Sequence, residues 1–297
     1  MTPIAVLGPG GVGGFLAAAL ERAGTSVTVV AHEQTAAAIE RDGLHVTSAR
    51  LGEFEARPRA VSELDAAGMT VIVATKATGL VGGLERIRRE PELVVPLLNG
   101  LEHLELLRER YGDRAVAASI RIESTRVGTG RIEQTSRFLG IDVAPPSPAV
   151  ERFAATLGAA GVPVRPMDSA AQVMWGKLVR LNAIACATSA FDLPLGPIRS
   201  DPELRAELRA CVEEAAAVAR ADGADVDPDV TMGELDDAHP ELDSSLHRDI
   251  EAGNPTELDA IAGAVLRAAA GHGLECPTIA SLAAHAAARA GVPAPTG

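Results

Sequence analysis

The stretch IAVLGPGGVG, residues 4–13, decides the fold of this chain. Its first four residues are apolar and typical of a buried β-strand, while the apolar periodicity of residues 12–23 is typical of an α-helix. Between these two segments, Gly8, Gly10 and Gly13 have the spacing G-x-G-x-x-G. The glycine spacing alone is a weak signal, but a strand, this turn and a helix together indicate a dinucleotide-binding unit.

The glycines of this turn have different physical tasks in such a unit. The first permits the tight turn, the second lets backbone N–H groups approach a pyrophosphate, and the third lets the helix pack on the strand. The helix N-terminus adds partial positive charge beside the anion. We therefore expect Gly8, Gly10, Gly11, Val12 and Gly13 to bind the cofactor. The alternative is an ordinary glycine-rich turn.

Composition limits the possible functions. The 297 residues are 47% apolar and 23% charged, which is typical of a soluble globular protein with room for two domains. The formal net charge of −13 argues against nucleic acid or an anionic membrane as partner, and 2% aromatic residues argue against base stacking. A small anionic substrate stays compatible, because a local pocket can be positive inside an acidic protein.

Cysteine usage and the apolar segments indicate the compartment. Cys186, Cys211 and Cys276 are odd in number and far apart, so they predict neither a disulfide framework nor a metal site. We see no charged region before the first strand and no apolar run long enough to cross a bilayer. We expect a soluble cytoplasmic protein, monomeric or homodimeric, with no bound metal.

Two different patterns of secondary structure follow one another along the chain. The first half alternates strands and helices, which predicts a mostly parallel, doubly wound sheet with helices on both faces. After Ser169 the pattern becomes long alanine- and leucine-rich helices. We therefore predict an α/β Rossmann-type domain over 1–167 and an all-helical substrate domain over 168–297. The expected strands are 4–7, 27–31, 69–75, 93–98 and 162–165, with β-rich segments at 115–127 and 130–143; the expected helices are 12–23, 35–41, 79–89, 101–110, 148–157, 170–190, 202–222, 257–272 and 277–288.

Polar residues follow two of the predicted strands. Lys76 comes directly after the strand 69–75, and Asn99 comes after the strand 93–98. Ligands of open α/β sheets lie outside the carboxyl ends of the strands, so both residues should face the cofactor. The alternatives are a solvated lysine and an asparagine that caps the next helix.

The helical half contains two further candidates. Lys177 lies in an apolar helix, where it either extends to solvent or occupies a pocket in which desolvation lowers its pKa. Ser244, Ser245 and Glu257 form the second candidate group, for which the alternative is plain helix punctuation around Pro255.

The motifs and their order resemble the ketopantoate reductases, which are NADPH-dependent 2-dehydropantoate 2-reductases, over essentially the whole chain. The resemblance implies an N-terminal Rossmann domain, a C-terminal helical domain and an active site in the cleft between them. The implied reaction, which belongs to pantothenate biosynthesis, reduces 2-dehydropantoate to (R)-pantoate. The landmarks are, in order, Gly8-x-Gly10-x-x-Gly13, Lys76, Asn99-Gly100, Trp175-x-Lys177-Leu178, Ser244-Ser245 and Thr256-Glu257-Leu258-Asp259.

The resemblance also implies roles for individual residues. Lys177 corresponds to the general acid that protonates the C2 carbonyl oxygen while hydride arrives at C2. Ser245 would hold the substrate carboxylate, and Glu257 would orient the lysine or a substrate hydroxyl. Asn99 would bridge cofactor and substrate, and Lys76 would line the nicotinamide side.

Two departures from the family pattern concern specificity. Many members carry asparagines four and eight residues after the lysine, but here these positions are Leu181 and Ala185, and Asn182 is one residue late. This change indicates a less polar substrate pocket. His32 occupies the position of the arginine that binds the NADP 2′-phosphate, and Glu33 follows it. We expect NADP, with NAD as the alternative.

Two alternative functions remain open. One is a related reductase of another 2-oxo acid or ketone. The other is a dinucleotide-binding sensor that has lost turnover.

Overall fold

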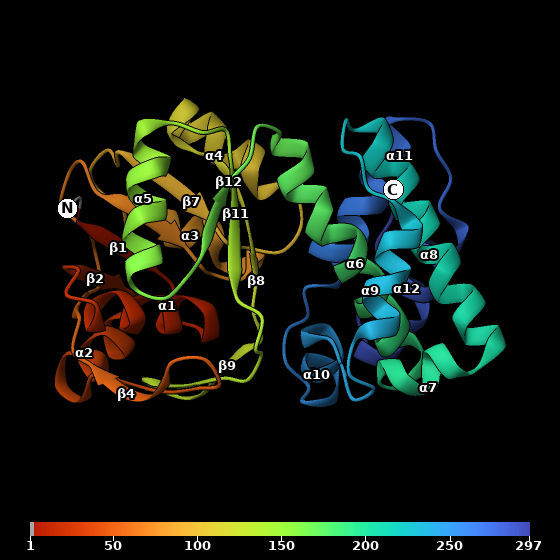
Figure 1. The fold of residues 1–297 in the computed structure, drawn as a ribbon, viewed down its shortest axis with the longest axis horizontal. Helices are drawn as coiled ribbons and strands as arrows, with labels where there is room; N and C mark the ends of the chain where they lie inside the picture. Colours follow the sequence, from red (N-terminus) through yellow and green to blue (C-terminus); the bar gives the residue numbers. More distant parts are fainter. Residues whose placement is uncertain (1–2) are drawn as a thin grey trace. The chain divides into compact units, whose positions relative to one another are not determined.

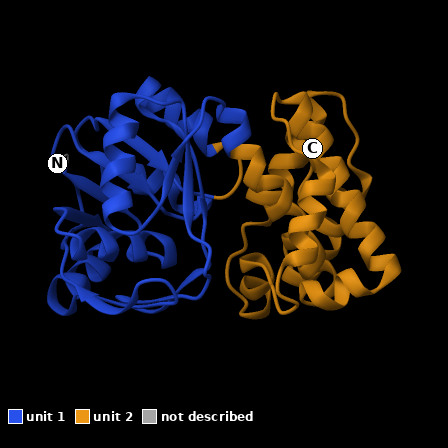
Figure 2. Cartoon of the chain, in the orientation of Figure 1, with its two compact units in different colours: residues 1–98, 103–173 blue, residues 99–102, 174–297 orange. Residues whose placement is uncertain are grey.

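The computed structural model describes residues 3–297 and shows two compact units (Figure 1; Figure 2). The first unit contains the chain up to residue 98 together with 103–173. The second contains 99–102 and 174–297. The short segment 99–102 therefore belongs to the helical unit, although its neighbours in sequence on both sides belong to the α/β unit.

A five-stranded, fully parallel sheet forms the centre of the first unit; a mostly parallel sheet was predicted, but the short edge strand β5 was not expected from the sequence. The strand order is β5-β2-β1-β6-β7, so the chain starts in the middle and its direction of winding reverses between β1 and β6. Such a reversal is the usual ligand position in doubly wound sheets. The strands are β1 (Ile4–Leu7), β2 (Val27–Val30), β5 (Arg59–Val61), β6 (Thr70–Val73) and β7 (Leu93–Pro96); the helices of this unit are α1 (Gly11–Arg22), α2 (Glu33–Asp42), α3 (Leu80–Leu84), α4 (His103–Tyr111) and α5 (Pro148–Ala159), with 3₁₀ turns at Ala77–Gly79 and Gly112–Arg114.

Both faces of this sheet are buried. Ile4 and Val6 belong to a core shared with α1 and α5, whereas Ala5 and Leu7 belong to a second core shared with α3 and α4. This alternation is the period of two of a β-strand, applied to a strand that is apolar on both sides.

Two smaller sheets complete the first unit. The predicted β-rich segments are confirmed, but the hairpin of β3 and β4 was not expected from the sequence. Its second strand, GEFEA, is mostly exposed and contains two glutamates, so it lacks the apolar pattern of a buried strand. The sheets have the orders β4-β3-β10-β9 and β12-β11-β8, formed by β3 (Leu44–Ser48), β4 (Gly52–Ala56), β8 (Ala117–Arg121), β9 (Ser124–Gly128), β10 (Arg131–Gln134), β11 (Gly140–Ala144) and β12 (Val164–Pro166).

The helix expected over 79–89 is much shorter in the structure. It ends at Leu84, because the chain after it forms backbone hydrogen bonds with Leu64 instead of continuing the helix. The Leu64 N–H donates to the Arg86 carbonyl at 2.8 Å, and the Arg88 N–H donates to the Leu64 carbonyl at 2.9 Å. Because of this pairing, Arg86 is not part of a helix, and its side chain extends toward Ser62 and His32.

The second unit is entirely helical from residue 174 onward, as predicted. Its longest helix, α6, is buried on all sides over 182–189 and is anchored by Trp175, whose indole N–H donates to Asp222 Oδ2 at 2.6 Å. Among residues 3–297, no helix is long and apolar enough to span a membrane. The helices are α6 (Ala170–Phe191), α7 (Leu195–Ser200), α8 (Pro202–Ala221), α9 (Pro228–Asp237), α10 (Ser245–Glu251), a π-helical turn at Asp259–Gly263, α11 (Ala264–Gly271) and α12 (Pro277–Ala290); α7, α9 and α10 were not expected.

The contact between α1 and β1 yields a stability prediction. A Cβ atom at residue 13 would lie 2.2 Å from the Gly8 carbonyl oxygen, so Gly13→Ala should lower the free energy of unfolding by about 2 kcal/mol. At residue 10 a Cβ would have no atom within 4 Å, and Gly10→Ala should cost less than about 1 kcal/mol. Urea unfolding of both variants checks this. Equal losses would contradict the packing argument.

Candidate active site

The glycine turn of the first unit is shaped by contacts within the chain at three of its four glycines. Gly8 has φ +91°, and a Cβ at Gly11 would lie 2.2 Å from the carbonyl oxygen of Ser124. Gly13 packs against the Gly8 carbonyl. Gly10 differs, because its φ of −74° suits any residue and its surroundings are open. Neither the packing nor the backbone conformation of the chain requires glycine at residue 10, but the absence of a side chain there leaves the backbone open to close approach by a ligand.

An unsatisfied hydroxyl lies beside this turn. Thr75 Oγ1 is buried and has no hydrogen-bond partner among residues 3–297, and its methyl group packs against Gly8. Lys76 is exposed and caps the 3₁₀ turn that follows β6. The open turn, the unpaired hydroxyl and the cation therefore occur where β1 and β6 end. This donor set suits the phosphates of a dinucleotide.

At the carboxyl end of β2, the structure places the guanidinium group of Arg86, which the sequence did not predict to be there. His32 is exposed at the N-cap of α2, and its Nδ1 lies 2.8 Å from Nη2 of Arg86. No regular sequence spacing connects residues 32 and 86, so only the folded chain reveals the pair.

The second unit brings together three of the predicted site residues. Lys177 Nζ donates to Asn99 Oδ1 at 2.9 Å, and Asn99 Nδ2 donates to Glu257 Oε2 at 3.0 Å. All three residues are partly buried. An ammonium can only donate and a carboxylate can only accept, so the Asn99 amide has one orientation in which both bonds form. Asn99 therefore links the lysine to the glutamate and does not cap the next helix.

Close packing holds Asn99 in this place. Gly100 has φ +88°, and a Cβ there would lie 2.2 Å from the Ala260 carbonyl oxygen in the π-helical turn. In addition, Arg267 binds both Glu102 and Asp259, which join the segment 99–102 to the same turn and raise the pKa of Arg267. The segment 99–102 and the π-helical turn are thus fixed together within the second unit.

The two adjacent serines of the helical unit have different environments. Ser244 is buried, caps α10 by accepting from the His247 N–H at 3.0 Å, and shares a hydrogen bond with Thr188. Ser245 is exposed, and its hydroxyl forms no hydrogen bond with another residue in the described part of the chain. The structure does not join Ser245 to the Lys177 group by a hydrogen bond.

The helix positions beyond Lys177 are apolar or are used internally. Leu181 is half-buried one turn after the lysine, and Ala185 is buried. Asn182 is fully buried and bonds the thiols of Cys186 and Cys211, each at 3.5 Å. Its amide is therefore committed to the core of the helical unit. The described cysteines are all free and buried.

The chain is similar to known proteins along nearly its whole length. The family model "Ketopantoate reductase PanE/ApbA" matches residues 4–145, and "Ketopantoate reductase PanE/ApbA C terminal" matches residues 169–295. The 2-dehydropantoate 2-reductase of Caulobacter vibrioides is 32% identical, over 96% of this chain and 98% of its own. This chain belongs to the ketopantoate reductase family.

Solved structures agree with that assignment. A 2-dehydropantoate 2-reductase from Geobacter metallireducens superposes with a TM-score of 0.88 at 25% identity, covering 96% of this chain and 98% of its own. A D-mandelate dehydrogenase solved with NADH and anilino(oxo)acetate also has a TM-score of 0.88, covering 98% and 99%; at 19% identity it shares the fold alone. As a ketopantoate reductase family member, the protein is an oxidoreductase, and the family implies a nicotinamide dinucleotide as cofactor.

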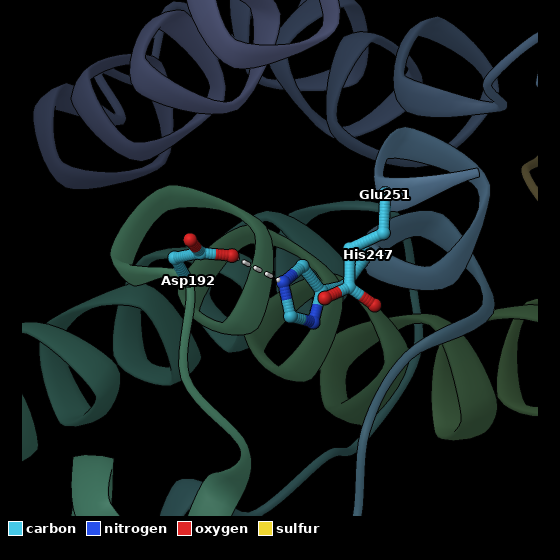
Figure 3. Close-up of side chains that lie close together, drawn as sticks. All are labelled: Asp192, His247 and Glu251. Atoms are coloured by element: carbon cyan, nitrogen blue, oxygen red, sulfur yellow. Dashed lines mark hydrogen bonds and ion pairs between the residues drawn. The ribbon is translucent and has the colours of Figure 1, made fainter. Parts of the chain in front are cut away.

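The second unit also contains a charged cluster that the sequence did not reveal. His247 is buried and uses both ring nitrogens, Nε2 with Asp192 at 2.9 Å and Nδ1 with Asp243 at 2.8 Å. Figure 3 shows its ring directed at Asp192, with Glu251 nearby. Asp192 also pairs with Arg289. A metal would need a free ring nitrogen, so the cluster acts as a structural link between the end of α6 and α10.

The His247 link yields a pH prediction. Burial opposes the charged imidazole, but the hydrogen bonds with Asp192 and Asp243 outweigh it and raise the pKa of His247 above its usual 6.5. Because the pKa is raised by folding, this contribution to stability is complete below 6.5 and is lost as pH rises through the folded pKa.

Melting temperatures should therefore fall as pH rises above about 6.5 in the natural protein, and fall less in His247→Gln. His285→Gln, at an exposed position, is the control and should keep the natural slope. An unchanged slope in His247→Gln would show that the cluster does not titrate with folding.

Proposed function

We propose that the protein is an NADPH-dependent reductase that converts 2-dehydropantoate to (R)-pantoate, with Lys177 as the proton donor. The hydrogen-bonded series Lys177–Asn99–Glu257 is the observation that carries the proposal. In this series an ammonium group, an amide and a carboxylate that are far apart in the sequence are in contact. Family membership supplies the class of reaction.

The lysine has the chemistry that ketone reduction requires. A bound NADPH supplies the hydride that adds to the carbonyl carbon, so negative charge develops on the carbonyl oxygen. The Lys177 ammonium stabilises this charge and transfers a proton to the oxygen, which leaves a hydroxyl group and a neutral amine. Glu257 fixes the Asn99 amide, and the amide oxygen in turn orients the ammonium.

Residue usage supports a proton-releasing role. Lys76 and Lys177 are the only two lysines in the chain, so arginine supplies 25 (27 − 2) of its 27 basic residues. An arginine side chain does not release its proton in proteins, whereas a lysine can. In a chain that otherwise uses arginine, a lysine in contact with Asn99 is consistent with a need for a transferable proton.

The remaining groups would hold the substrate and the cofactor. Ser245 offers an exposed hydroxyl to the substrate carboxylate, whereas Ser244 is committed to its helix cap. The open backbone at Gly10 and the unpaired hydroxyl of Thr75 would receive the dinucleotide, with Lys76 beside them. Asn99 would contact both molecules through its amide.

Replacing the lysine tests the proposed mechanism. Lys177→Ala should lower kcat by about 10² to 10⁴, as loss of a general acid does, while the Kd for NADPH stays within about threefold. Lys177→Arg keeps the positive charge but cannot release the proton, so its kcat should also stay low. NADPH oxidation with 2-dehydropantoate measures both variants. Natural activity in Lys177→Arg would exclude the proton-donor role.

A second candidate is a reductase of 2-oxo acids with apolar side chains. Leu181 favours it, because a half-buried apolar side chain lies one helical turn beyond Lys177, and Asn182, the asparagine that follows it in the helix, is bonded to buried thiols. The D-mandelate dehydrogenase that shares the fold was solved with anilino(oxo)acetate. The two candidates differ only in substrate.

Comparing substrates separates these candidates. If the second is correct, kcat/KM should be higher for 3,3-dimethyl-2-oxobutanoate, which differs from 2-dehydropantoate only in lacking the hydroxyl, and Leu181→Asn should shift the preference toward the hydroxylated acid by about tenfold. Val230→Asn, which makes the same kind of change at an exposed position, is the control and should leave the substrate preference unchanged. Binding of NADPH without turnover of any 2-oxo acid would favour a sensor.

A further inference from the structure

Arg86 is held beyond the neighbouring carboxyl ends of β5 and β2, by its backbone and its side chain. Its carbonyl accepts from the Leu64 N–H at 2.8 Å, so the backbone is fixed by the short pairing after α3. Its Nη1 donates to the Ser62 carbonyl at 3.0 Å, and its Nη2 contacts His32 Nδ1 at 2.8 Å. The side chain is half-buried, so it is positioned but still accessible.

The contacts of Arg86 differ from those of the arginines beside it. Arg88 binds Glu63 through two hydrogen bonds, and Arg89 binds Asp65. The hydrogen bond to Arg88 is the main cause of the lowered pKa of Glu63. Arg86, in contrast, has only a carbonyl and an imidazole as partners among residues 3–297. Its positive charge is therefore not neutralised by a carboxylate in direct contact.

The position of this charge is where dinucleotide-binding sheets distinguish NADP from NAD. The end of the second strand lies beside the adenosine ribose, where an acidic residue selects NAD and a nearby arginine accommodates the 2′-phosphate of NADP. Here Ala31 is buried and uncharged, and His32 accepts from Arg86 through Nδ1, which leaves its ring proton on Nε2. The arginine and the histidine together present a cation and a neutral donor.

We infer that Arg86 is the residue that selects NADP over NAD, by binding the 2′-phosphate together with His32. The inference rests on the proposed dinucleotide site. It assigns the selecting charge to the segment after α3, whereas the sequence pattern places it at the end of β2. A guanidinium binds phosphate through two parallel N–H groups, so contact with the 2′-phosphate would exchange its neutral partners for an anionic one.

Binding of two cofactors and a fragment tests this assignment. Dissociation constants for NADPH, NADH and adenosine 2′,5′-bisphosphate are measured by nicotinamide fluorescence and by competition, with no turnover needed. Arg86→Gln should weaken NADPH and the bisphosphate by about 10- to 100-fold and NADH by less than about threefold. Arg86→Lys keeps the charge without the fork and should give a smaller loss.

Arg88→Gln is the matched control, because it removes an arginine two residues away whose charge is paired with Glu63. It should leave all three dissociation constants within about threefold. Equal weakening of NADPH and NADH by Arg86→Gln, no weakening of either, or equal affinity of the natural protein for both would overturn the assignment while leaving the reductase proposal standing. Failure of the natural protein to bind either dinucleotide would overturn both.

Discussion

Burial of both faces of the parallel sheet is the constraint on which the rest of the first unit depends. β1 contributes alternate side chains to two separate cores, so no position within the strand can carry a polar group without loss of packing. Polar chemistry is therefore confined to the strand ends. Because all five strands are parallel, their carboxyl ends meet at one edge, where Thr75, Lys76 and His32 occur.

In the helical unit, the equivalent constraint is the close contact between Gly100 and the π-helical turn. A side chain at residue 100 would collide with the Ala260 carbonyl, so only glycine lets Asn99 come beside Glu257. Once there, the amide has a single orientation that satisfies both the lysine and the glutamate. The π-helical turn is an irregularity of the kind that recurs at functional sites. A small irregularity in the backbone thus positions three side chains of different chemistry.

The accuracy of the sequence predictions varied with the strength of the local pattern. Four of the five strands of the parallel sheet and the long helices α6, α8 and α12 were predicted because continuous apolar runs and helical periodicity are local signals. The hairpin of β3 and β4 was missed because GEFEA is stabilised by its neighbours and not by its own pattern. The helix expected over 79–89 was wrong beyond Leu84, where pairing with Leu64 overrides helix propensity.

By itself, the sequence determined that this is a dinucleotide-type α/β protein with a helical second half, and it identified Lys177, Asn99 and Glu257 as candidates one by one. Those properties depend on residue type, spacing and periodicity, which are local. Only the tertiary structure decided three further contacts. Asn99 forms hydrogen bonds with both Lys177 and Glu257, the Asn182 amide forms hydrogen bonds with buried thiols, and Arg86 contacts His32. Each of these depends on contacts between residues distant in the chain, or between neighbouring helices, and such contacts are set by packing.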